Sequence, residues 1–160
     1  MSRVLALEIA AEDDRLWASG QARRFAEALG FSTLDRARLA VCVAELASNA
    51  AKHAGGGRIE LAEVASPRAG CRVRAEDAGP GIACVDEALR DGFSEGRWLT
   101  PDVPLGERRG LGVGLGAVCR MLSDVRLSPR AGGGLVIEAV MWRGSWDQHS
   151  NEEVETWRRT

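Results

Sequence analysis

The feature that most constrains the fold is LDRARLAVCVAELASNAAKHA (34–54), a long stretch without glycine or proline. Its apolar residues recur every three or four positions, the spacing that places side chains on one side of an α-helix. They are Leu39, Val43, Leu46 and Ala50. Ser32 or Thr33 can cap the start of this helix, and Gly55-Gly56-Gly57 ends it. The pattern predicts a long helix whose apolar stripe faces a core.

Three polar residues lie at the margin of that stripe. Glu45 and Asn49 are four positions apart, and Lys52 follows three positions later, close to the same line. A buried carboxylate or amide costs free energy unless it has a partner. This edge of the helix is therefore solvated, engaged in a capping interaction near the helix end, or part of a site, and the helix pattern leaves these interpretations open.

A second motif, EDAGPGI (76–82), follows a stretch that alternates as a strand. Asp77 stands at the exit of this strand, where its carboxylate can accept a hydrogen bond from an exocyclic amine. Gly79 and Gly81 let the backbone approach a flat ligand closely. A surface turn would look the same, so this motif is ambiguous when taken by itself.

The third motif, GLGVGLG (110–116), puts a glycine at every second position where a helix over 111–123 begins. Free backbone amides and the helix dipole make such an end a binding place for phosphate. Each glycine costs roughly 1 kcal/mol of helix stability relative to alanine, which suggests a use. The spacing is not that of a Walker loop, and the motif is a weak signal in isolation.

The remaining pattern predicts further strands, helices and one long connection. The expected strands are Val4–Ile9, 58–64, 71–77, 124–129 and 135–142. A helix capped by Asp13 or Asp14 runs to about Leu29, and 84–91 and 150–153 suggest short helices. Residues 92–110 exceed the usual loop length of about 12 residues, which is typical of a functional lid.

Composition excludes several classes of protein. The net charge is −2 and no stripe of lysine or arginine stands out, so we expect no nucleic-acid partner. No apolar run approaches the ~20 residues of a membrane span, and nothing resembles a signal peptide, so we expect a cytoplasmic protein. Four cysteines without a C-x-x-C pair indicate free thiols rather than a metal site: Cys42, Cys71, Cys84 and Cys119.

The order ELASNAAKH, DAGPGI, GLGVGLG resembles the Bergerat ATP-binding fold of the GHKL superfamily over roughly residues 34–142. A closer resemblance is to the small RsbT-like serine/threonine switch kinases, carried by AELASNAAKHAGGG, DGFSEG, GLGVGLGAVCRMLSD and a core ending in MW. It implies an α+β fold, a two-layer sandwich whose mixed, mostly antiparallel sheet is covered on one face by helices. It further implies a single domain over 1–142, with a lid at about 92–110 and a polar tail over 143–160.

The resemblance assigns roles around ATP and Mg²⁺. Asp77 would accept the adenine amine, with Gly79 and Gly81 as the pocket floor. Asn49 would bind Mg²⁺, Glu45 would be the general base, and Lys52 would reach a phosphate.

It also places the lid around the phosphates. The lid base would be Gly110, Gly112, Gly114 and Gly116. One of Arg97, Arg108 and Arg109 would stabilise the transferring phosphoryl group, or all three are solvated loop charges. Leu135 stands where many family members carry a threonine that contacts the adenine site, which suggests weaker adenine binding or a substituting water.

The function implied is an ATP- and Mg²⁺-dependent serine/threonine kinase of a stressosome-like partner-switching pathway. Its substrate would be a STAS-domain protein of the anti-sigma-antagonist type, and a phosphatase or a sigma-regulatory protein would be further partners. Two alternatives stay open: an anti-sigma factor that binds a sigma factor directly, and a nucleotide-sensing binding module without catalysis.

Overall fold

A computed structural model describes residues 2–81, 93–94, 97–98 and 114–144. The elements, in chain order, are β1 (Val4–Ile9), α1 (Asp14–Ala28), α2 (Thr33–Ala54), β2 (Gly57–Val64), β3 (Gly70–Asp77), β4 (Phe93–Ser94), β5 (Arg97–Trp98), α4 (Gly114–Met121), β6 (Ser123–Pro129) and β7 (Leu135–Trp142). The two predicted helices over 84–91 and 150–153 lie outside the described residues. Residues 111–113, the start of the helix predicted over 111–123, lie outside them as well.

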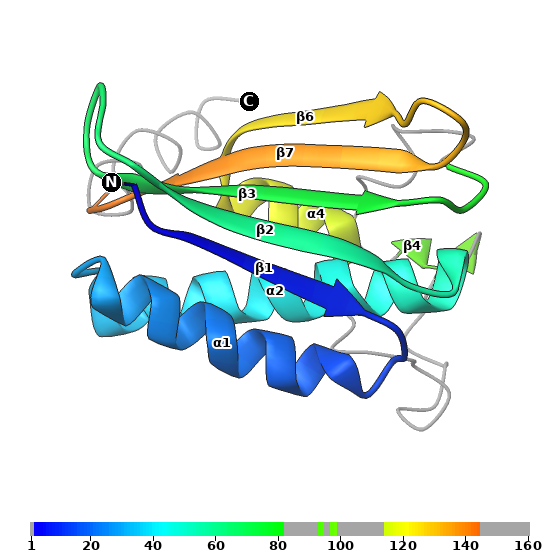
Figure 1. The fold of residues 1–160 in the computed structure, drawn as a ribbon, viewed down its shortest axis with the longest axis horizontal. Helices are drawn as coiled ribbons and strands as arrows, with labels where there is room; N and C mark the ends of the chain where they lie inside the picture. The colour runs from blue at the N-terminus through cyan, green and yellow to red at the C-terminus, as the bar shows by residue number, and fades with distance from the viewer. Residues whose placement is uncertain (1, 82–92, 95–96, 99–113, 145–160) are drawn as a thin grey trace, which may run out of the picture.

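Five strands form one sheet in the order β1-β2-β3-β7-β6, and every one of these pairings is antiparallel. The helices α1, α2 and α4 lie on the same face of this sheet (Figure 1). The predicted α+β sandwich is therefore confirmed. Within the predicted lid, β4 and β5 pair as two-residue strands, which the sequence pattern did not indicate.

Both ends of α2 are capped as predicted. The Ser32 hydroxyl accepts a hydrogen bond from the Asp35 N–H at 3.1 Å, and Gly55 ends the helix with a left-handed φ of 69°. The apolar stripe is buried. Burial extends well beyond the stripe, because α1, α4 and the sheet all contact α2.

The aspartate that makes hydrogen bonds at the start of α1 is not the residue at the N-cap position. Asp13 occupies the N-cap position but its side chain makes no capping bond. The Asp14 carboxylate instead accepts hydrogen bonds from the N–H groups of Ala10 and Ala11 at 2.8 and 2.9 Å, which lower its pKa. Three alanines at helical spacing, Ala18, Ala22 and Ala26, form the buried side of α1. Their small side chains let α1 pack closely on α2.

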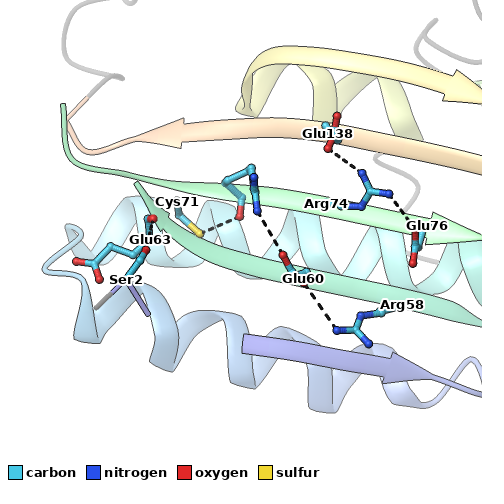
Figure 2. A network of polar contacts seen from close by, with 9 residues as sticks. Ser2, Arg58, Glu60, Glu63, Cys71, Arg74, Glu76 and Glu138 are labelled. Atoms are coloured by element: carbon cyan, nitrogen blue, oxygen red, sulfur yellow. Dashed lines mark hydrogen bonds and ion pairs between the residues drawn. The ribbon is translucent and has the colours of Figure 1, made fainter. Parts of the chain in front are cut away.

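The sheet has a helix-covered face and an open face. Ile59, Leu61 and Val73 point toward the helices and are at most 1% exposed. The open face carries charged residues that pair across the strands, as Figure 2 shows for Arg74, which contacts Glu138 at 2.8 Å and Glu76 at 3.0 Å. Alternation along each strand thus separates the core from a solvated charged surface.

Candidate functional site

The second half of α2 and the end of β3 meet at Gly57, the first residue of β2. A Cβ atom added there would lie 3.0 Å from the Ala50 Cβ and 3.4 Å from the Asp77 Cβ, and 2.6 Å from the Glu76 carbonyl oxygen. A side chain would therefore push the three elements apart. Glycine at this position brings Asp77 next to the turn of α2 that contains Asn49 and Ala50.

Asp77 fixes its own loop with one carboxylate oxygen. Its Oδ1 accepts a hydrogen bond from the Gly79 N–H at 2.9 Å. The Oδ2 atom has no hydrogen-bond partner among the described residues. Asp77 lies on the helix-covered face of β3, the same face as Val73 and Ala75, because alternate residues of a strand share a face. The second oxygen is therefore available to a ligand between sheet and helices.

Two glycines hold the Asp77 loop against its neighbours. A Cβ at Gly79 would lie 2.7 Å from the Ala54 Cβ, and one at Gly134 would lie 1.9 Å from the Asp77 carbonyl oxygen. Gly79 was predicted for its approach to a ligand, and the structure gives it a packing role against α2 as well. Gly134 was not predicted as a residue of the site. Gly81 adopts a left-handed φ of 78°.

Glu45 is buried, with 6% of its surface exposed, so the interpretation of this edge as solvated is wrong for Glu45. The Cys42 thiol, one turn earlier on α2, has its pKa raised to about 12, mainly by burial, then by the nearby Cys119 and Glu45. Asn49 is half-buried, and its side-chain amide makes no hydrogen bond within the described part of the chain.

Lys52 forms an ion pair rather than standing free. Its Nζ lies 3.6 Å from Oε1 of Glu12, in the turn before α1, and 11% of the Lys52 side chain is exposed. Glu12 was not predicted, because nothing in the local pattern of either segment connects residues 40 positions apart. The contact brings Glu12 beside the half of α2 that carries Asn49 and Lys52.

The glycine-rich motif is described from Gly114 onward. Gly114, with a φ of 70°, and the buried Gly116 lie in the first turn of α4, which packs on α2. Gly110 and Gly112 lie outside the described residues, as do Arg108, Arg109 and the side chain of Arg97.

Leu135 pairs directly with Asp77 in the β3–β7 ladder. Opposite residues in an antiparallel pair point to the same face of a sheet. The position that departs from the family pattern is therefore beside the carboxylate predicted to bind adenine, where an isobutyl group replaces a hydroxyl.

A pocket of about 370 Å³ lies near the other end of α2 and contains none of the predicted site residues. Its lining is Gly30, Ser32, Leu34, Asp35, Arg38, Arg143 and Gly144.

The site residues fit ATP with Mg²⁺. In the described part of the chain no three His, Cys, Asp or Glu side chains come together as a metal site. Mg²⁺ in nucleotide sites keeps water and phosphate ligands and takes about one or two from the protein. The unpaired Asn49 amide oxygen is a suitable donor, and the unpaired Asp77 oxygen suits an amine.

The chain is similar to known proteins over most of its length. The model of the histidine kinase-like ATPase domain family matches residues 10–141. The serine/threonine-protein kinase RsbT of Bacillus subtilis (strain 168) is 36% identical over 137 residues, which cover 85% of this chain and 94% of that protein. None of the helices described here has the length and apolar character needed to cross a membrane.

Proposed function

The chain belongs to the histidine kinase-like ATPase family and is a serine/threonine-protein kinase, and we propose that it phosphorylates a STAS-domain protein in a partner-switching pathway. The observation that carries the proposal is that Gly57 brings Asp77, at the end of β3, close to Ala50 in the half of α2 that also carries Asn49 and the buried Glu45. Residues 1–142 form the kinase domain in this proposal, with 92–110 as the lid, 143–160 as a polar tail, and a cytoplasmic location.

Each residue has one task in the proposed reaction. Asp77 orients the adenine by accepting its amine, and Asn49 holds Mg²⁺. When bound, MgATP supplies the γ-phosphoryl group. Glu45 takes the proton from the substrate hydroxyl while the hydroxyl oxygen bonds to the γ-phosphorus. The bond between the γ-phosphorus and the ADP oxygen breaks at the same time. The phosphorylated partner gains about −1.5 to −2 charge, enough to switch its binding.

Lys52 would bind a phosphate of ATP in this scheme. Its pairing with Glu12 keeps the ammonium ordered at the edge of the site, and a triphosphate offers it a stronger partner. Gly114 and Gly116 would present backbone N–H groups of α4 to the same phosphates.

The test separates chemistry from binding through Glu45→Gln, which keeps size and polarity but cannot take a proton. General-base catalysis contributes about 10²–10⁴-fold, so single-turnover transfer from ATP to the STAS protein should slow by that factor. Nucleotide affinity by calorimetry should stay within about twofold, or about 0.4 kcal/mol, because Glu45 is assigned to proton transfer and not to nucleotide binding. Asn49→Ala should lose the Mg²⁺-dependent part of nucleotide affinity as well.

Glu60→Gln is the matched control, because Glu60 lies on the open face of β2. It should transfer phosphate at the wild-type rate. A Glu45→Gln protein with the wild-type rate would remove Glu45 from catalysis.

Leu135 beside Asp77 favours one alternative, a nucleotide-sensing module. A wild-type protein that binds ATP but phosphorylates none of the STAS-domain proteins of its own organism would favour that alternative. Co-purification with a sigma factor would favour an anti-sigma factor instead.

A further inference from the structure

The outer side of α1 carries a stripe of residues that the proposed function does not use. Its members are spaced four, three, four and three positions apart: Asp13, Trp17, Gly20, Arg24 and Glu27. We call this set the α1 stripe. Trp17 is 50% exposed, and its neighbour Leu16 is 72% exposed. An exposed tryptophan with adjoining apolar surface is a feature of protein contact sites.

Gly20 at the centre of the stripe has no role in the folding of the described chain. It is exposed, and an added Cβ atom would have nothing within 4 Å. Glycine inside a helix is about 1 kcal/mol less favourable than alanine. The fold would therefore be more stable with alanine, and what glycine provides is a hollow one turn from Trp17.

The charges of the stripe are arranged asymmetrically along the helix. Asp13 at the start and Arg24 near the end have no ion-pair partner among the described residues. Glu27 is already engaged by Arg36 at 2.8 Å. One end of the stripe thus offers a free carboxylate and the other a free guanidinium.

We propose that two copies of this chain associate through the α1 stripe, with their α1 helices antiparallel. A two-fold axis between residues 18 and 19 sets Trp17 of each copy against Gly20 of the other, so that the indole enters the hollow. The same axis sets Asp13 of each copy against Arg24 of the other. One patch therefore supplies both halves of the contact, as a two-fold interface requires.

The charges of the α1 stripe favour this arrangement over a parallel pair and over an antiparallel pair in another register. A parallel pair would bring Arg24 against Arg24, and an antiparallel pair centred on Gly20 would bring Asp13 against Glu27. Like charges in contact are destabilising. The antiparallel pair also aligns the two helix dipoles favourably.

The interface is small, because a helix of 15 residues is about 22 Å long. Such a contact is below the standard interface size, so we expect a dissociation constant in the micromolar range, about 1–100 µM. The contact reaches Asp13, next to Glu12, which holds Lys52. Association therefore takes place beside the candidate site, although the inference does not rest on the proposed function.

The test is analytical ultracentrifugation of the full chain across about 1–300 µM, a range that brackets this affinity. Wild type should show a monomer–dimer equilibrium. Trp17→Ala should weaken it by at least about tenfold, as loss of a central aromatic residue does. Arg24→Asp should weaken it comparably, and Asp13→Arg combined with Arg24→Asp should restore it.

Two controls match these changes outside the stripe. Leu34→Ala removes a 56% exposed apolar side chain at the start of α2, and Arg130→Asp makes the same charge change in the β6–β7 turn. Both should dimerise as wild type. Gly20→Leu fills the hollow and should abolish the dimer while raising thermal stability, so its effect cannot come from unfolding.

Three results would overturn the inference. A wild-type chain that stays monomeric at the highest concentration would show that the α1 stripe does not bind a second copy, and a different protein would then be its partner. A dimer that survives both Trp17→Ala and Arg24→Asp uses another surface. A charge-swapped double variant as weak as Arg24→Asp breaks the proposed antiparallel register.

Discussion

Charged side chains on the open face of the sheet pair with one another in water, whereas the carboxylates of Glu45 and Asp77 lie on the helix-covered side. On the open face Glu60 and Arg74 bridge neighbouring strands, as Figure 2 shows, and Arg58 pairs with Glu8 of β1. These three side chains are 27–46% exposed. On the covered side Glu45 is buried on α2, and Asp77 keeps an oxygen without a partner in the described chain.

The difference separates charges that pair in water from carboxylates to which the proposed function assigns a ligand. Exposed ion pairs are worth about 0–1 kcal/mol each, so the open face tolerates change. A carboxylate between sheet and helices displaces apolar packing and costs free energy without a partner. The Asp77 oxygen without a partner in the described chain is therefore the one that the proposed function assigns to a ligand.

The largest effect that sharpens this comparison is on stability. Leu61, fully buried on the covered face of β2, should lose about 2–5 kcal/mol of unfolding free energy as Leu61→Ala, because a cavity remains. Its neighbour in the same strand, Glu60, faces water, and Glu60→Ala should cost about 1 kcal/mol or less. Urea denaturation measures both, and equal losses would contradict the two-face description.

The next effect concerns ligand affinity in β3, where adjacent residues face opposite ways. Asp77→Asn should weaken ATP binding by about 10–150-fold, the worth of a hydrogen bond to a charged group. Glu76→Gln, on the open face, should leave ATP affinity unchanged. Titration calorimetry on the two variants decides the matter, and a wild-type protein that binds GTP as tightly as ATP would contradict adenine recognition by Asp77.

The smallest expected effect is on the open face. Arg74→Ala removes contacts to both Glu76 and Glu138, yet should lower the unfolding free energy by about 1 kcal/mol or less, because all three side chains are in contact with water. The loss should shrink further in about 1 M salt, which screens exposed pairs. A loss above 2 kcal/mol by urea denaturation, at the level of a core residue, would break the comparison.

Much of the fold was predictable because it is encoded within single segments. The cap at Ser32, the left-handed Gly55 and the four-residue spacing from Glu45 to Asn49 are local properties of α2. The alternation over 71–77 likewise placed Asp77 at a strand exit, and the five strands of the large sheet lie where they were expected.

Contacts between distant segments were not predictable in the same way. Ser48 points away from the apolar stripe of α2 and would be expected in water, yet it is 2% exposed, and its hydroxyl finds no hydrogen-bond partner in the described part of the chain. The side opposite the stripe is buried because neighbouring helices pack on α2, and helical periodicity within α2 carries no information about them.

The sequence by itself determined the elements, their ends and the residue types of a nucleotide site, since these follow from backbone preferences and spacing along one segment. Only the tertiary structure decided that Glu45 is buried, that Lys52 is held by Glu12, and that Gly134 leaves room for the carbonyl of Asp77. These outcomes depend on which atoms from distant segments compete for the same space or charge. That competition exists only once the chain has formed its sheet and packed its helices against it.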